Sequence, residues 1–367
     1  KHFISSLFKS IKKYNSLKCN ADILNLTIDN IKIGDLVYDT YLRFYNKPTL
    51  NNKNFGVFII ILRSYQFLAI TNELYSSIQL KKYFSSYCTY INHGLPVRFF
   101  LRKNIEVFSA GNVYEIIKKH IPEDYLQTRN LEFSETINKH KIQLGLDKIS
   151  RRVEGVEKLP FMRATTYNSF NTNKYSTDLD GIVFLHDIFD SPHIFGEMIF
   201  EDFFKWTIYT LDLIREFNLK IGIKPHPNQT NESKQIVAKL KSKYRDLNWI
   251  DESIPNNVLL GSKIKFGVSV YGSIIGELAY FNKFSITCGN NPYNGLSFIR
   301  NSKNIKHYKE TLLESVGDNK LYNFKDDVGA FYYRLYDNNL NHYNISDKIL
   351  ENRFNEKAQK IIYDNGI

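Results

Sequence analysis

Short apolar runs along the second half of the chain are separated by stretches with helical spacing. The runs lie at 182–185, 219–223, 264–270 and 284–287, and the helical stretches lie at 200–217, 234–244 and 274–280. Buried strands that alternate with helices are typical of a parallel sheet with helices on both of its faces. The pattern therefore predicts an α/β fold for this half.

The first half of the chain shows the same alternation less regularly. Residues 24–34 predict a strand, and a helical pattern follows to residue 44. The apolar run at 55–62 fits either a strand or the start of a long helix. Residues 87–94 predict a strand that ends in Asn-His-Gly and exposes His93, and residues 105–111 predict the next strand.

A polar stretch rich in Asn, Ser and Thr divides the chain at 164–180 and is typical of an interdomain linker. The 367 residues are enough for two domains, each with its own core. We therefore expect an N-terminal domain at 1–163 and a C-terminal domain at 181–330. Helices at 331–367 are expected to cross back to the first domain.

The sequence Lys224-Pro225-His226-Pro227 directly follows the predicted strand at 219–223. Two prolines within three residues forbid both a continuing strand and an immediate helix, so a rigid loop presents Lys224 and His226. Residues 230–233 can begin a helix. In open α/β sheets ligands bind at this end of the strands, and a cation, an imidazole and a helix N-terminus suit a phosphate-bearing ligand. The alternative is a stiff turn with an ordinary surface histidine.

Three further loops of the second half follow predicted strands and carry polar side chains. They lie at 186–193, 269–277 and 288–295 and contain Asp187, Asp190, His193, Ser269, Ser273, Glu277 and Asn291. The carboxyl ends of parallel strands converge on one side of a doubly wound sheet. Hydroxyls and backbone N–H groups at 269–273 can cradle phosphate oxygens. Glu277 is either an acceptor for a ribose or base, or a buried structural carboxylate.

Asp35, Asp39 and Arg43 recur at four-residue spacing, which places all three on one face of a helix. An acidic pair plus an arginine at the mouth of a strand–turn–helix unit suits catalysis or acceptor binding. The alternative is a surface ladder of ion pairs. His93, at the end of another predicted strand, is a further candidate for the cleft.

The formal net charge of +11 favours acidic partners such as nucleotides, anionic lipid or a charged polymer. Three widely spaced cysteines without metal-ligand spacing fit a reduced, cytoplasmic protein and predict neither a disulfide framework nor a zinc site. The best apolar run, at 55–62, is shorter than the roughly 20 residues that span a bilayer. Residues 1–18 predict a basic amphipathic helix that either rests on a membrane surface or packs on its own domain.

Several common catalytic motifs are absent from the sequence. It contains no G-x-x-x-x-G-K-[ST], no G-x-G-x-x-G and no G-x-S-x-G. P-loop NTPases, standard Rossmann dehydrogenases and enzymes with a nucleophile elbow are therefore disfavoured.

The order strand, Lys-Pro-His-Pro, helix, then strand, Ser-x-x-x-Ser-x-x-x-Glu, helix, then a strand ending near Gly-Asn-Asn-Pro at 289–292 resembles the C-terminal half of GT-B glycosyltransferases. More narrowly, it is similar to bacterial enzymes of capsule and surface polysaccharide biosynthesis that carry a His-Pro motif. These include polysialyltransferases, Kdo transferases and teichoic-acid CDP-glycerol transferases. Residues 34–43, 92–94 and 190–193 also look like parts of surface-carbohydrate proteins, so the resemblance touches both halves.

In these families the His-Pro histidine and a downstream Ser or Thr contact the phosphate of the donor, commonly in a cytidine nucleotide. The resemblance implies that His226 and either Ser269 or Ser273 make those contacts. The acidic motif that supplies the base in polysialyltransferases has no clean match, since residues 178–181 agree with it only approximately. We expect the general base at Asp39 or Asp35, with Asp187 and Asp190 as the next candidates.

Together these features predict a GT-B glycosyltransferase with two Rossmann-like domains facing each other across a cleft. We expect a nucleotide-sugar donor, CMP-linked in preference to UDP-linked, and a capsule or lipopolysaccharide glycan, or a glycolipid, as acceptor. Transfer is expected to be inverting, without metal or cofactor, in the cytoplasm and in peripheral contact with the inner membrane. Donor binding is expected at Lys224, His226, Ser269, Ser273 and Glu277.

Two alternative functions remain at this stage. The same His-Pro chemistry can support transfer of a polyol phosphate from a CDP-donor, as in teichoic-acid synthesis. The chain can also be a non-catalytic protein that binds a glycan or nucleotide. No recognised nucleic-acid-binding motif occurs, so nucleic acid is not an expected partner.

Overall fold

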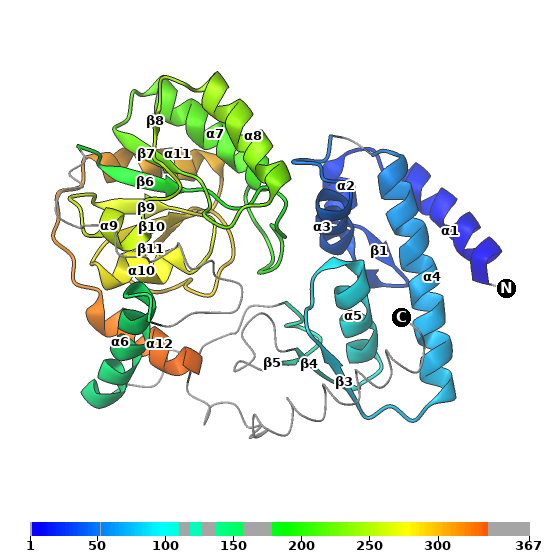
Figure 1. Cartoon of the computed structure of the whole chain (residues 1–367). Helices are drawn as coiled ribbons and strands as arrows, with labels where there is room; N and C mark the ends of the chain where they lie inside the picture. Colours follow the sequence, from blue (N-terminus) through cyan, green and yellow to red (C-terminus); the bar gives the residue numbers. More distant parts are fainter. Residues whose placement is uncertain (1, 52, 110–117, 127–136, 157–177, 337–367) are drawn as a thin grey trace.

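In the computed structural model, residues 2–51, 53–109, 118–126, 137–156 and 178–336 are described. They form two bodies, each with its own hydrophobic core (Figure 1). Most of the expected linker at 164–180 lies outside the described residues, and so does the part of the expected terminal helices beyond residue 336.

The second body is built on six parallel strands. Their spatial order is β11-β10-β9-β6-β7-β8, which reads 6-5-4-1-2-3 when the strands of this body are counted along the chain. This is the doubly wound order of nucleotide-binding sheets. It confirms the α/β class predicted for this half. The strands are β6 (Gly181–Phe184), β7 (Ile221–Lys224), β8 (Asn248–Trp249), β9 (Phe266–Val268), β10 (Phe284–Thr287) and β11 (Ile299–Asn301).

Helices cover both faces of this sheet. On one face α7 (Phe203–Glu216) and α11 (Ile305–Val316) pack together, and Trp206 Nε1 donates a hydrogen bond to the Tyr308 hydroxyl at 3.0 Å. The indole and the phenol are both buried, and this bond gives the indole N–H a partner inside the core. Helix α8 (Asn231–Lys243) follows β7 and begins at the Thr230 side chain, which accepts a hydrogen bond from Ser233 N–H.

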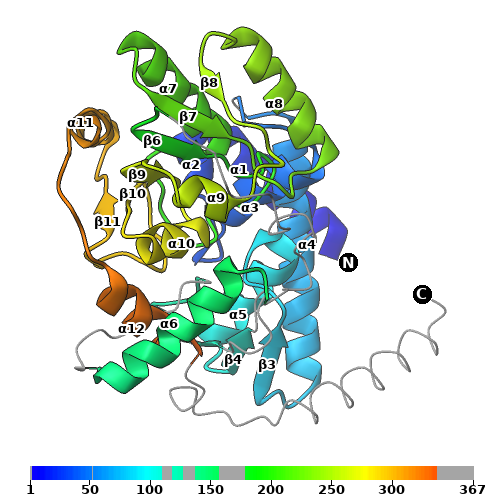
Figure 2. The same cartoon turned by 60° about the vertical axis from the view of Figure 1, so that its left-hand side comes forward.

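The opposite face carries α9 (Asn256–Leu260) and α10 (Ile274–Tyr280), as Figure 2 shows. Helix α10 comes very close to β9 because that strand contains Gly267. A Cβ atom at this position would lie 2.3 Å from Leu278 Cδ1, so a larger residue would push the helix away. The close approach fixes the start of α10 at the carboxyl end of β9.

Helix α6 (Lys139–Val153) joins the second body although the sequence placed it in the domain at 1–163. It packs against α10 and α12 (Lys325–Tyr336), and Ile149 is part of the second core. The weak apolar pattern of residues 120–160 does not show which body this helix will join.

The first body is mostly helical and has a smaller sheet. Within the described residues β3 pairs parallel with β4, and β5 pairs antiparallel with β4. The elements are α1 (His2–Ser16), α2 (Asn20–Leu24), β1 (Thr27–Ile28), β2 (Ile31–Lys32), α3 (Gly34–Phe44), α4 (Phe55–Ser77), β3 (Lys82–Ser85), the π-helical turn η1 (Tyr90–Gly94), α5 (Leu95–Arg102), β4 (Glu106–Ser109) and β5 (Lys118–His120).

The apolar run at 55–62 begins the long helix α4, so the helical interpretation of this run is correct. The Asn54 side chain caps the helix by accepting a hydrogen bond from Val57 N–H at 3.3 Å. By length and composition alone, α4 is the one helix in the described part of the chain that could cross a membrane, and 39% of its most apolar window is buried in the protein.

Two predicted strands of the first half take other forms. Residues 24–34 contain the hairpin β1–β2, whose turn residues Asp29 and Asn30 have φ values of 45° and 62°. Positive φ at both positions is typical of a tight hairpin turn. Residues 87–94 end in η1, which leads directly into α5 with Pro96 in its first turn. A proline is tolerated in the first turn of a helix, because the backbone N–H that it lacks would have no hydrogen-bond partner within the helix.

The two bodies meet at α3 and at the loops after β6. Asp202 accepts hydrogen bonds from the Tyr38 hydroxyl at 2.8 Å and from the Thr49 hydroxyl at 2.6 Å. His193 lies against Asp39 in the same contact. The fold is therefore α/β, with two bodies that face each other, as expected for a GT-B arrangement.

Candidate functional site

A cavity of about 470 Å³ lies at the carboxyl ends of β6, β7 and β9. Strands β6 and β9 are neighbours, and the chain leaves β6 toward one edge of the sheet and β9 toward the other. The cavity therefore occupies the topological switch point, where open α/β sheets bind their ligands. Its lining includes Arg43, Arg152, His186, Asp187, Asp190, Lys224, His226, Thr230, Asn256, Ser269, Tyr271, Gly272, Ser273 and Glu277.

Lys224 is the last residue of β7, is buried and lines the cavity. Its ammonium donates a hydrogen bond to the Glu252 carbonyl at 3.1 Å. Burial disfavours the charged form and lowers the pKa of Lys224 to about 8. The side chain is therefore mostly cationic at neutral pH and close to losing its proton.

His226 is held in one tautomer by its own loop. The Asn228 N–H donates to His226 Nδ1 at 3.2 Å, so the proton of the neutral ring is on Nε2 and can be donated to a ligand. Burial also lowers the pKa of His226, which keeps the ring neutral near pH 7. Residues 225–230 form a loop between β7 and α8, as the sequence predicts.

Ser269 is positioned by His186, which the sequence did not single out. The Ser269 hydroxyl lies 3.1 Å from His186 Nε2, and the Tyr271 N–H points to the same nitrogen at 3.4 Å. His186 is stacked on Phe203, and burial lowers its pKa to about 3. A neutral acceptor at Nε2 thus holds the serine and the following turn in place.

Ser273 lines the cavity one residue before α10, and its side chain makes no capping bond to the helix. The turn that delivers it contains Gly272 with φ of 124°, a conformation that side-chain-bearing residues rarely adopt. The glycine allows the backbone to pass close to the cavity wall. Both serines predicted for donor binding therefore lie in the cavity.

The two aspartates of the loop after β6 have different surroundings. Asp187 accepts hydrogen bonds from Phe189 N–H at 2.9 Å and from Thr230 N–H at 2.5 Å, so it ties this loop to the start of α8. Asp190 accepts from Ser191 N–H at 2.9 Å, lines the cavity and is exposed to solvent. Partial removal of water by the surrounding protein, and then the nearby Asp187 carboxylate, raise the pKa of Asp190.

Glu277 is a buried carboxylate at the cavity wall. It lies 3.3 Å from Arg152 Nε and 3.4 Å from Asn256 Nδ2. Arg152 belongs to α6, the helix whose position the sequence did not predict. These contacts fit a structural role for Glu277, and its donor-binding role stays a prediction. Arg152 adds a cation to the cavity lining.

The candidates from the first half divide between the cavity and its surroundings. Arg43 lines the cavity and is exposed to solvent. Asp39 instead forms a buried pair with His193, whose Nδ1 lies 2.6 Å from Asp39 Oδ1. Asp35 forms a two-bonded ion pair with Arg98, at 2.7 and 2.5 Å. Of the three residues at four-residue spacing, Arg43 lines the cavity, whereas Asp39 and Asp35 are each paired with another side chain.

The pKa shifts in these pairs follow from burial and charge. Burial opposes the charged form of Asp35, but the Arg98 guanidinium outweighs it and holds the pKa of Asp35 below its ordinary value. Burial likewise opposes the charged form of His193, but Asp39 outweighs it and raises the pKa of that imidazole. Burial outweighs His193 at the other partner of this pair and raises the pKa of Asp39. Both carboxylates therefore have a hydrogen-bonding partner within the protein itself.

Two further candidates lie outside the cavity lining. His93 is half-buried in η1, and burial lowers its pKa. Asn291 is buried and organises its own loop: its side chain donates to the Gly289 carbonyl at 3.1 Å and accepts from Tyr293 N–H at 2.9 Å. The roles predicted for these residues and for the paired aspartates stay predictions, but their side chains do not reach this cavity.

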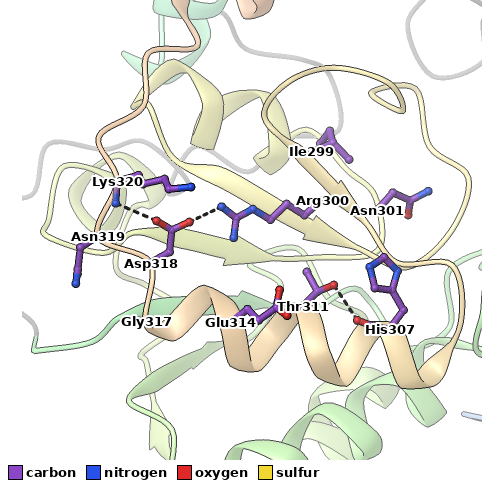
Figure 3. Close-up of a pocket in the computed structure, with 10 residues that line it drawn as sticks. All are labelled: Ile299, Arg300, Asn301, His307, Thr311, Glu314, Gly317, Asp318, Asn319 and Lys320. Carbon is purple, nitrogen blue, oxygen red and sulfur yellow. Dashed lines mark hydrogen bonds and ion pairs between the residues drawn. The ribbon is translucent and has the colours of Figure 1, made fainter.

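A second hollow, of about 870 Å³, lies beside β11 and α11 (Figure 3). Its most prominent charged groups are already paired, because Arg300 Nη2 lies 2.5 Å from Asp318 Oδ2. The Arg300 guanidinium also lies 3.5 Å from the centroid of the Phe284 ring. The smaller cavity, where donors and acceptors face open space, is the stronger candidate site.

Asp178 and Asp180 lie close together in the sequence, as metal ligands often do, but each is paired with a lysine. Asp178 lies 2.6 Å from Lys220, and Asp180 lies 2.9 Å from Lys265. In the described ranges no three His, Cys, Asp or Glu side chains come together in a group that could hold a metal ion.

Comparison with known proteins finds weak structural similarities and no family. No protein-family model and no curated protein matches the chain. A glycosyltransferase from Rickettsia africae shares 9% identity over 86% of this chain and 82% of that one, with a TM-score of 0.37. The UDP-GlcNAc 2-epimerase of Methanocaldococcus jannaschii, solved with UDP-GlcNAc and UDP, shares 11% identity over 78% and 81% with a TM-score of 0.34.

The β-Kdo 2,4-transferase KpsC of Thermosulfurimonas dismutans is also similar, with 14% identity and a TM-score of 0.35. The match covers 55% of this chain and 57% of that protein, so the chain spans little more than half of its length. With likenesses of this size, the function has to be argued from the geometry of the cavity.

Proposed function

We propose that the protein is a glycosyltransferase that moves a sugar from a nucleotide-activated donor to a growing surface glycan. The observation that carries the proposal is the convergence of Lys224, His226 and Ser269 in one cavity at the switch point of a doubly wound sheet. A cation, an N–H donor and a hydroxyl at this place suit the phosphate of a nucleotide.

In the proposed reaction the bond between the sugar anomeric carbon and the donor phosphate breaks. Negative charge then develops on the departing phosphate oxygen. Lys224 and the Nε2–H of His226 stabilise this charge, and they are already oriented by the Glu252 carbonyl and the Asn228 N–H. Removing one preorganised donor of this kind typically lowers the rate by about 10²–10³-fold.

The acceptor hydroxyl forms the new bond to the anomeric carbon and gives its proton to a base. We assign this base to Asp190 in preference to Asp39 or Asp35, because Asp190 alone of the three lines the cavity. Its raised pKa makes the carboxylate a better proton acceptor than an ordinary aspartate. Arg43 from the first body faces the same space and is placed to bind the acceptor.

The donor is proposed to be a CMP-sugar, and the acceptor a capsule or lipopolysaccharide glycan. Support for the cytidine base comes from the resemblance of Lys224-Pro225-His226-Pro227 to the His-Pro families. Arg152 and Glu277 also line the cavity and lie 3.3 Å from each other.

A thermal-shift screen with CMP, CDP, UDP, GDP and ADP tests this function, on the wild type, on His226→Ala and on His93→Ala as a matched control. A ligand at 100 times its Kd adds about 2.7 kcal/mol to the free energy of unfolding, so a shift of several degrees is expected with CMP. His226→Ala should lose this shift and His93→Ala should keep it.

Other outcomes of the screen are equally informative. A shift with UDP and none with CMP would keep the transferase and change the donor. A shift with CDP, together with release of CMP from a CDP-polyol, would favour transfer of a polyol phosphate. No shift with any nucleotide would contradict the proposed function.

A further inference from the structure

Helix α1 packs on α4 in an unusual orientation. Its buried positions are small and polar: Ser6 and Ser10 face the protein, and the Ser10 hydroxyl bonds to the Ser6 carbonyl at 2.6 Å. Ile4 and Phe8, by contrast, are 65% and 69% exposed. A helix on a water-soluble surface normally turns its apolar side inward, so α1 presents the opposite of the expected face to solvent.

The neighbouring helix α4 continues this apolar surface. Its residues Phe55 and Ile70 are 73% and 58% exposed, and Leu74 is also exposed. The two helices lie side by side at the outer edge of the first body, away from the second body (Figure 1). Large apolar side chains gathered on two adjacent helices are typical of a surface that meets a partner.

A cavity of about 470 Å³ opens between α1, α4 and α5, and three cations line it. The ammonium of Lys9 lies 5.8 Å from the Tyr65 ring centroid, and that of Lys103 lies 5.5 Å from the Tyr75 ring centroid. Arg102 donates to the Asp29 carbonyl at 2.6 Å. Asp29 also lines the cavity, but among the described residues no carboxylate forms an ion pair with any of the three cations.

The charge of α1 indicates which kind of partner this apolar surface binds. Helix α1 carries Lys9, Lys12 and Lys13 and has no acidic residue. An apolar face beside basic side chains is complementary to a lipid surface with anionic headgroups. A second copy of the same face is a poorer fit, because a symmetric contact would bring like charges together.

We propose that the first body docks on an anionic bilayer through α1 and α4, with a lipid phosphate bound in the cavity between α1, α4 and α5. The exposed side chains of Ile4 and Phe8 enter the headgroup–acyl boundary, and Lys9, Arg102 and Lys103 neutralise the phosphate. This surface is separate from the cavity at the sheet, so it can be tested without any assumption about the transferase reaction.

The test is flotation with vesicles of phosphatidylcholine alone and of phosphatidylcholine with phosphatidylglycerol. The wild type should bind the anionic vesicles, and binding should fall as salt is raised. Ile4→Ser with Phe8→Ser should lower the partition coefficient at least about tenfold, because two large apolar groups leave the lipid. Ile305→Ser with Leu321→Ser removes two exposed apolar residues of the second body and should leave binding unchanged.

The charged cavity has its own pair of variants. Lys9→Glu with Lys103→Glu should lower the partition coefficient about tenfold or more, since each basic residue near an anionic surface contributes to binding. Lys303→Glu with Lys306→Glu makes the same change of charge on exposed positions of the second body and should have a much smaller effect.

Three results would overturn the proposal. The first is no binding to either kind of vesicle, and the second is an equal loss in the two pairs of charge variants. The third is a dimer in lipid-free buffer that Ile4→Ser with Phe8→Ser dissociates, which would assign this face to a second copy of the chain. Nucleotide thermal shifts should be the same in all four variants, so a failure here leaves the transferase proposal standing.

Discussion

Two groups of charged residues in this protein look alike in the sequence and differ in the structure. The cavity at the sheet contains Asp190, His226 and Arg43, and the contact between the bodies contains Asp39, His193 and their surroundings. In the cavity these side chains line open space, and backbone N–H groups donate to Asp190 and His226. In the contact they face each other, with His193 Nδ1 only 2.6 Å from Asp39 Oδ1.

The difference shows that residue type and spacing identify reactive side chains. They do not show whether such a side chain binds a ligand or pairs with another residue of the protein. A buried Asp–His pair satisfies its own charge and needs no ligand, whereas a carboxylate at a cavity mouth lacks that partner. What decides between them is which side chain meets which after the two bodies come together. That contact is made by residues 154 positions apart in the chain.

Exchange of Asp190 for Asn should have the largest effect, because Asp190 lines the cavity and Asp39 does not. A general base typically contributes about 10²–10⁴-fold to the rate, so Asp190→Asn should lower kcat by that factor while nucleotide binding stays intact. Asp39→Asn removes a carboxylate of the contact and should leave kcat within a few-fold. The measurement is initial transfer rate with the donor that the thermal-shift screen identifies, normalised to folded protein.

The reverse result would exchange the roles of the two groups. If Asp39→Asn stopped transfer and Asp190→Asn did not, the base would lie at the contact and the bodies would have to separate during the reaction. Loss of nucleotide affinity in Asp190→Asn would place that carboxylate on the donor side.

The sequence predicted the second body well because its signals are local. Each apolar run ends at a clear stop, such as the prolines around His226, and parallel strands bring those ends together. Lys224, His226, Ser269, Ser273 and Asp190 were all named from this pattern, and the structure collects them in one cavity.

The remainder of the site depends on contacts between distant segments. His186 carried a signal, since it follows directly after a predicted strand, but Arg152 lies in a helix with a weak pattern. The first half was predicted less well for a related reason. Its run at 55–62 has the composition of a strand, and only the absence of Gly and Pro from residue 57 to residue 77 indicates the helix.

Removal of the Asp35 carboxylate should have the next largest effect, and on stability instead of rate. Asp35→Ala leaves the Arg98 guanidinium buried without its ionic partner, which typically lowers the free energy of unfolding by about 3–5 kcal/mol. Asp246→Ala breaks a similar two-bonded pair with Arg215 on the surface and should have only a small effect. Urea denaturation of the two variants makes the comparison directly.

Equal losses in these two variants would mean that burial is not what distinguishes the paired carboxylates. A loss of transfer in Asp35→Ala at a temperature where it is fully folded would return Asp35 to the list of catalytic candidates. Neither result is expected, because the Asp35 side chain lies outside the cavity lining.

The smallest effect should come from Lys224, and its pH dependence has a definite sign. The pKa of this lysine is lowered to about 8, so it is charged at pH 7 and loses its proton as the pH rises through that value. A nucleotide phosphate has its second pKa near about 6 and is already fully charged. His226 does not change charge in this range either, because its pKa is lowered and the ring stays neutral. The affinity for CMP should therefore fall by up to about tenfold between pH 7 and pH 9.

Lys224→Arg separates this titration from any other, because arginine keeps its charge throughout the range. The variant should bind CMP with nearly constant affinity from pH 7 to pH 9, as measured by calorimetry. If the wild type showed no change, Lys224 would not contact the phosphate. If the variant kept the wild-type slope, the titrating group would lie elsewhere. Since Lys224 ends the strand that leads to His226, either result would move the phosphate away from the carboxyl end of β7.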